Sequence, residues 1–192
     1  MPGPVARSTA RTRLDGVSLL AITPGDGRDL MPWLEALAEA GLPAVLIREP
    51  TLSWVTLRRV SSVPIPHVFV HTKNPHAGQL HLPLHGPGQI GRSCHDEADV
   101  DAAFRDGAHY ALLSPVWRPT SKPADVRPTL GLTRFLDCAG DRPVFALGGV
   151  DTARYHTLRA RGARAAVSGA LFGTASPQHA ADVLKGFLQT AP

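Results

Sequence analysis

Eight short apolar segments recur along the chain, and most of them alternate with stretches of helical periodicity. The segments are residues 17–23, 44–47, 67–70, 79–82, 89–95, 109–113, 143–147 and 165–167. Short apolar runs of this kind are typical of strands that are covered on both faces. Strands alternating with helices predict a parallel sheet, and a count of eight favours a single-domain (β/α)8 TIM barrel over an open doubly wound sheet.

Helical periodicity fills most of the intervals between these segments. Residues 29–40 place Leu30, Trp33 and Leu34 at helical spacing, and Asp29 can cap the first turn. Further helices are expected over residues 51–60, 97–106, 132–138, 152–161 and 177–188. The interval between the third and fourth strand segments leaves little room for a helix.

Composition indicates a soluble globular protein. The chain has 192 residues, of which 43% are hydrophobic and 19% charged. We expect one barrel domain over residues 17–192 after a disordered leader over residues 1–16, which contains several arginines and no apolar core. No apolar run reaches the length of a membrane span. Cys94 and Cys138 lie far apart without metal-ligand spacing, so we expect free thiols in a reducing cytoplasm. The sequence leaves a homodimer open.

The charge pattern bears on the type of ligand. The net charge of +4 comes from arginines scattered along the chain, and the few aromatic residues are not interleaved with them. This pattern argues against a nucleic-acid surface and suits an anionic small molecule. Polar residues stand at the expected strand ends, which in a barrel surround the mouth where active sites are built. They are Arg48, His71, His81, Ser93, His95, Ser114, Gly148 and Ser168.

The ends of the last two strands predict an anion site. Gly148 and Gly149 follow the seventh strand, and Ser168 and Gly169 follow the eighth. Backbone N–H groups at such strand ends, beside a helix N-terminus, form a cradle for phosphate, and barrels repeatedly bind phosphate at this place. The alternative is that the glycines serve only tight turns between strand and helix.

Several segments resemble, in order and spacing, the family of thiamine phosphate synthase and its TenI-type relatives, whose fold is a (β/α)8 barrel. The similarity covers roughly residues 19–184 and includes VLIREP, IGRSCHDEADV, GAHYALLSPVWRPTSK, PTLGL, PVFALGGV and GARAAVSGALFG. The resemblance implies a part in thiamine biosynthesis, with thiazole phosphate or thiamine phosphate as the small-molecule ligand. It also implies no cofactor, apart from Mg²⁺ if the chain is a synthase.

Synthases of this family join hydroxymethylpyrimidine diphosphate to a thiazole phosphate. The resemblance places Arg48, Ser121 and Lys122 at diphosphate-binding positions and Ser93 at the family serine after strand five. It also matches the glycine pair and the Ser168–Gly169 turn to the cradle for the thiazole phosphate. Arg48 therefore either contacts the ligand or forms a structural ion pair with Glu49.

Other positions depart from the synthase pattern. The Asn-Asp pair that ends strand three in synthases reads His71–Thr72 here, and the second magnesium aspartate corresponds to Gly86. Both carboxylate ligands are thus replaced, so we expect no metal site and no normal Mg²⁺-dependent coupling. The main expectation is a TenI-like protein that binds a thiazole phosphate. The alternatives are a divergent synthase, which is a transferase, and a non-catalytic regulator that binds a phosphate ligand.

The TenI branch includes thiazole tautomerases, which are isomerases that transfer a proton. Their histidine after strand six corresponds to Pro115 in this chain. Proton transfer near neutrality usually uses histidine. His71, His81, His85 and His95 stand at the predicted mouth and could take that role. Our candidate catalytic residues are His71 and His81, together with Ser93 and Lys122.

Overall fold

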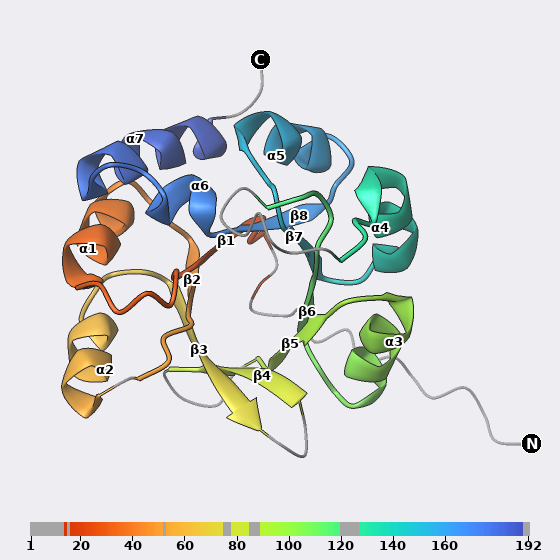
Figure 1. Ribbon diagram of the computed structural model, residues 1–192, viewed down its shortest axis with the longest axis horizontal. Helices are drawn as coiled ribbons and strands as arrows, with labels where there is room; N and C mark the ends of the chain where they lie inside the picture. The colour runs from red at the N-terminus through yellow and green to blue at the C-terminus, as the bar shows by residue number, and fades with distance from the viewer. Residues whose placement is uncertain are drawn as a thin grey trace, which may run out of the picture.

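The computed structural model describes residues 14, 16–51, 53–74, 78–84, 89–119 and 127–189. Eight strands close into a barrel in the order β1 to β8 (Figure 1). They are β1 (Leu19–Ile22), β2 (Ala44–Ile47), β3 (His67–Asn74), β4 (Gly78–Pro83), β5 (Gly91–Cys94), β6 (Tyr110–Leu113), β7 (Val144–Leu147) and β8 (Arg164–Val167). The predicted closed barrel of eight strands is confirmed. The predicted leader lies almost wholly outside the described residues.

Helices form the outer layer of the barrel (Figure 1). They are α1 (Met31–Glu39), α2 (Trp54–Ser61), α3 (Glu97–Arg105), α4 (Gly131–Ala139), α5 (Thr152–Arg159), α6 (Gly169–Phe172) and α7 (Pro177–Leu188). Within the described part of the chain, none of these helices is long and apolar enough to cross a membrane.

Side-chain caps explain where most of these helices begin. Ser53, Asp96, Asp151 and Ser176 each accept a hydrogen bond from the backbone N–H three residues later, at the starts of α2, α3, α5 and α7. Helix α1 begins two residues after Asp29, whose carboxylate accepts a hydrogen bond from the Met31 N–H at 3.1 Å. The predicted helix starts are thereby confirmed to within two residues for α1, α3, α5 and α7, whereas α2 begins at Trp54, three residues after the predicted start at residue 51.

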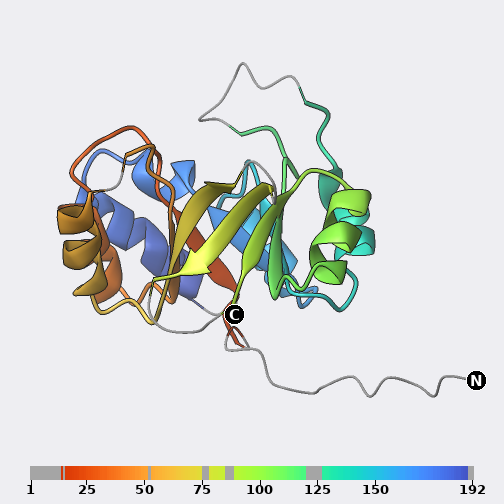
Figure 2. The ribbon, with the colours of Figure 1, turned by 90° about the horizontal axis from the view of Figure 1, so that it is seen from below.

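Strand β4 differs from the expectation of a wholly parallel barrel. It pairs antiparallel with both β3 and β5, whereas the other strand pairs are parallel. Only residues 75–77 separate β3 from β4, and a parallel crossover needs a dozen or more residues. The two strands therefore form a hairpin, visible in yellow in Figure 2. The short interval was recognised in the sequence, but the reversed direction of β4 was not predicted.

Alternating side chains divide the core into two parts. One cluster fills the barrel itself and includes Leu20, Leu46, Phe69, Tyr110 and Phe145. The other lies between the strands and the outer helices, with residues of the opposite parity on each strand. Since Ala44 and Leu46 point inward, the same alternation turns Arg48, two residues further along, toward the barrel mouth.

The Tyr110 ring fills the barrel beside β5 because residue 91 is a glycine. A Cβ atom at position 91 would overlap the Tyr110 ring, which packs between Phe69 at 5.1 Å and Phe145 at 5.8 Å between ring centroids. The ring is fully buried and cannot move aside without disturbing the interior of the barrel.

We expect Gly91→Ala to lower the free energy of unfolding by about 1–3 kcal/mol, the usual cost of overpacking a core. Gly186→Ala is the matched control, because its Cβ would stand 3.8 Å from Thr152 in ordinary contact and alanine favours the interior of α7. Urea unfolding of both variants measures the difference. Equal stability of the two variants would contradict this account of the core.

Candidate functional site

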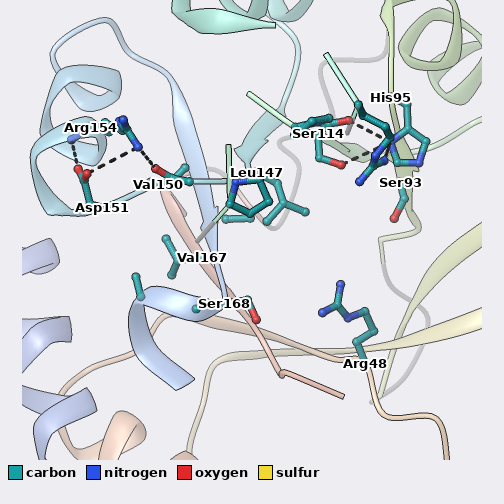
Figure 3. Close-up of a pocket in the computed structure, with 18 residues that line it drawn as sticks. Arg48, Ser93, His95, Ser114, Leu147, Val150, Asp151, Arg154, Val167 and Ser168 are labelled. Carbon is teal, nitrogen blue, oxygen red and sulfur yellow. Dashed lines mark hydrogen bonds and ion pairs between the residues drawn. The ribbon is translucent and has the colours of Figure 1, made fainter. Parts of the chain in front are cut away.

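A cavity of about 430 Å³ opens at the carboxyl ends of the parallel strands, and we call it the mouth cavity (Figure 3). Its lining brings together eight residues that the sequence analysis selected: Arg48, Ser93, His95, Ser114, Gly148, Gly149, Ser168 and Gly169. His71 and His81 do not line it. Ser121, Lys122 and Gly86 lie outside the described residues.

Arg48 enters the mouth cavity from the end of β2. Its backbone N–H donates to Thr23 Oγ1 at 2.8 Å, which fixes the turn after the strand. Its guanidinium points into the cavity (Figure 3) and forms no hydrogen bond or ion pair with the described residues. Glu49 instead accepts a hydrogen bond from the Gly25 N–H at 3.1 Å. Burial lowers the pKa of Arg48 and the Glu49 charge partly offsets this, but arginine keeps its charge. The arrangement therefore favours ligand contact over an ion pair.

Gly148 and Gly149 have a second structural reason to be glycine. Both have positive φ, at 99° and 63°. A Cβ on Gly148 would stand 3.0 Å from the Trp117 carbonyl oxygen, and one on Gly149 would stand 2.6 Å from that of Arg118. The loop after β6 is hydrogen bonded here, because the Trp117 N–H donates to the Gly148 carbonyl at 3.1 Å. The glycine pair thus seats this loop as well as lining the mouth cavity.

Free donors remain on the cavity side of these turns. The backbone N–H groups of Gly149, Gly169 and Ala170 have no acceptor among the described residues. The Ser168 hydroxyl also lacks a partner there and points into the cavity (Figure 3). Successive N–H groups aimed at one space form an anion-binding concavity. The geometry is thus compatible with the predicted phosphate cradle.

Arg154 is a lining residue that the sequence analysis missed. It lies in the first turn of α5, donates to the Gly149 carbonyl at 2.5 Å and stacks 5.2 Å from the centre of the Trp117 ring. Asp151 caps the same helix and lies 3.8 Å from the Arg154 guanidinium (Figure 3). Only the fold could reveal this role, because the helical pattern of residues 152–161 shows no reason to single out one arginine.

Arg127 is a second lining residue that the sequence analysis missed, and it lies beside the predicted His95 on the opposite wall. His95 Nδ1 is 3.0 Å from the Ser114 carbonyl oxygen and 2.9 Å from an Arg127 nitrogen. Among the described lining residues, three arginines therefore face the cavity against the single carboxylate of Asp151. This excess of positive charge favours an anionic ligand.

The polar side chain of His81 lies inside the barrel, below the mouth cavity. His81 is fully buried, and its Nε2 lies 3.0 Å from the Ser93 hydroxyl oxygen. The rings of His71 and Tyr110 each lie 5.6 Å from the His81 ring. Burial lowers the pKa of His81 to about 3, and the nearby charges of His71 and Arg48 act in the same direction. His81 therefore lacks the titration near neutrality that proton transfer requires.

The described residues offer little to a divalent metal. They contain no group of three or more His, Cys, Asp or Glu side chains placed to hold an ion. Asp151, the one carboxylate among the described lining residues, already accepts from the Arg154 backbone and pairs with its guanidinium. Mg²⁺ prefers oxygen ligands that include carboxylates, so this part of the cavity does not fit it.

Comparison with known proteins identifies the family. A family model described as thiamine monophosphate synthase (TMP-TENI) matches residues 58–171, more than half of the chain. The chain belongs to the thiamine monophosphate synthase family. This confirms the resemblance on which the sequence analysis relied.

Curated relatives of this family member are named thiamine-phosphate synthase. The protein of Mycobacterium marinum is 38% identical over 125 residues, and that of Mycobacterium tuberculosis 36% over 126 residues. Each match covers 60% of this chain but only 57% of the relative, so the chain spans under three fifths of their length.

Solved structures support the fold of this family member. Thiamine phosphate pyrophosphorylase from Pyrococcus furiosus aligns with a TM-score of 0.64 at 17% identity, covering 89% of this chain and 95% of that one. A structure described as native KDPGal aligns with a TM-score of 0.55 at 16% identity, covering 90% and 93%. At these identities the likeness concerns the barrel alone.

The low pKa of His81 predicts a pH dependence of stability. Between about pH 6 and pH 4 the unfolded state binds a proton on this histidine and the native state does not, so stability falls as the pH falls. One proton contributes a slope of about 1.4 kcal/mol per pH unit. His81→Gln should remove that part of the slope in urea unfolding at several pH values. The exposed control His179→Gln should keep it, and parallel slopes for wild type and His81→Gln would contradict the assignment.

Proposed function

We propose that the chain is a transferase of the thiamine-phosphate synthase type, which joins hydroxymethylpyrimidine diphosphate to a thiazole phosphate. The observation that carries this proposal is the pairing of two anion-binding parts in one cavity. One part consists of the Ser168 hydroxyl with the N–H groups of Gly149 and Gly169, and the other is the Arg48 guanidinium. Membership of the family and the names of the relatives support the same reaction.

In this proposal the two parts have different tasks. The turns after β7 and β8 hold the phosphate of the thiazole substrate, which fixes its ring over the cavity. Arg48 stabilises the negative charge that develops as diphosphate leaves the pyrimidine, and the Ser93 hydroxyl donates to the same group. Ser121 and Lys122 stay predicted diphosphate contacts. The thiazole nitrogen then forms the new bond to the pyrimidine methylene carbon as the bond to diphosphate breaks.

A second candidate is a protein that binds the thiazole phosphate without coupling it. The replacement of both synthase carboxylates, by Thr72 and Gly86, favours this candidate. Isomerase chemistry has less support, because Pro115 stands at the tautomerase histidine and the pKa of His81 is far below neutrality. Both candidates bind the substrate phosphate in the cradle, so only a measurement of turnover separates them.

The test is formation of thiamine phosphate from the two substrates by purified full chain, with Mg²⁺ and with a chelator. We expect product in the presence of wild-type protein. Arg48→Ala should lower kcat/KM about 100-fold, because a charge that stabilises the leaving group is lost. Arg48→Lys should retain part of the rate, since it keeps the charge but not the planar fork of donors.

Arg59→Ala is the matched control for this assay, since Arg59 is an exposed arginine on α2 outside the mouth cavity. It should leave kcat/KM unchanged. Absence of product at high enzyme concentration, together with thermal stabilisation by thiazole phosphate, would overturn the transferase proposal and leave the binding protein. Loss of both turnover and stabilisation would overturn both candidates.

A further inference from the structure

The contact between His81 and Ser93 joins the barrel interior to the mouth cavity. Ser93 lines the cavity, whereas His81 lies behind it on β4 with no exposed surface. Their only described polar contact is the one between His81 Nε2 and Ser93 Oγ, at 3.0 Å. The hairpin brings them together, because the reversed β4 pairs residue 81 with residue 91, two positions before Ser93.

The other nitrogen of His81 decides which atom of the ring carries the proton. His81 Nδ1 is buried and has no hydrogen-bond partner among the described residues, and the same holds for the nearby Tyr110 hydroxyl oxygen. A neutral imidazole has one N–H donor and one acceptor nitrogen. A buried N–H without an acceptor is rarer and more costly than an acceptor without a donor. The proton therefore belongs on Nε2, which faces Ser93.

The charged form of His81 does not offer an alternative. A doubly protonated ring would place an unpaired N–H and a positive charge inside the barrel, next to the His71 ring and within the field of Arg48. The low pKa of His81 agrees with this geometry. His71 from β3 and Arg48 from the end of β2 are the charged groups that lower the pKa of His81, and the Tyr110 phenol from β6 is the other titratable group packed against its ring.

We propose that His81 is a positioning residue, whose Nε2–H donates to Ser93 Oγ and thereby directs the Ser93 hydroxyl proton into the mouth cavity as a donor to an anionic ligand. Ser93 Oγ has no other partner among the described residues. When this oxygen accepts the hydrogen bond from His81, the Ser93 hydroxyl proton can therefore donate only toward the cavity. His81 thus acts through Ser93 and transfers no proton. The inference rests on the proposed function only in taking the ligand to be anionic.

The first measurement needs no ligand. Protein labelled with ¹⁵N histidine is examined by long-range ¹H–¹⁵N correlation between pH 5 and pH 8, with His81→Gln identifying the resonance. We expect a neutral ring with the proton on Nε2 over the whole range. A ring protonated on Nδ1, or one that titrates within this range, would overturn the inference even if the chain forms thiamine phosphate.

The second measurement is calorimetric binding of inorganic pyrophosphate to the full chain. Ser93→Ala and His81→Leu should each weaken binding about tenfold, the usual effect of losing one hydrogen bond to a charged group. The double variant should bind no more weakly than either single variant, because both changes remove the same donor. His81→Gln should bind within about threefold of wild type, since its amide can donate to Ser93 from a similar place.

His179→Gln is the control for histidine replacement at an exposed position and should leave pyrophosphate binding unchanged. Losses that add to about 100-fold in the double variant would overturn the positioning role, as would equal binding by His81→Leu and wild type. Absence of pyrophosphate binding by wild type would overturn it as well. An Nε2 proton with coupled losses, but no thiamine phosphate formation, would uphold this inference and refute only the proposed reaction.

Discussion

The shape of the mouth cavity depends on one close contact, between the glycine pair after β7 and the loop after β6. The carbonyl oxygens of Trp117 and Arg118 stand only 3.0 Å and 2.6 Å from where Cβ atoms at positions 148 and 149 would be. Because the backbone approaches this closely, the Trp117 ring can lie under Arg154, and Arg154 can reach the Gly149 carbonyl. A side chain at either glycine would displace the loop and open the wall of the cavity. Beside this contact, the Gly149 N–H has no acceptor among the residues that the structure describes.

Charge and backbone donors then determine what the cavity can hold. Arginines reach it from the end of β2, from α5 and from the segment before α4. Asp151, the one carboxylate among the described lining residues, is occupied by a helix cap and an ion pair. An anionic ligand is favoured and a hard dication is not. Both the backbone donors of the cavity and the names of the relatives support the proposal of a phosphate-bearing substrate. The resemblance described in the sequence analysis implies that Thr72 and Gly86 stand in place of the synthase carboxylates, which is the departure from the family pattern that bears on the proposed reaction.

Much of the fold could be predicted from local patterns. The eight apolar runs and the caps at Asp96 and Asp151 each depend on a few neighbouring residues in the sequence. The direction of β4 was not predicted, because alternation is the same for either direction, although the interval to β3 is too short for a parallel crossover and implies a hairpin. Site residues that directly follow a strand, such as Arg48 and Ser168, could be predicted from the sequence. Arg154 was missed because its role depends on a contact with Trp117 that lies far away in sequence.

The most direct test of the central claim is a crystal structure of the full chain with thiamine phosphate bound. The account predicts phosphate density within hydrogen-bond distance of the Gly149 and Gly169 N–H groups and the Ser168 hydroxyl, with the rest of the ligand extending toward Arg48. The arginine and loop contacts around the glycine pair should persist. Phosphate density outside the mouth cavity, or a cavity without ligand at saturating concentration, would contradict the claim that this cavity is a phosphate site.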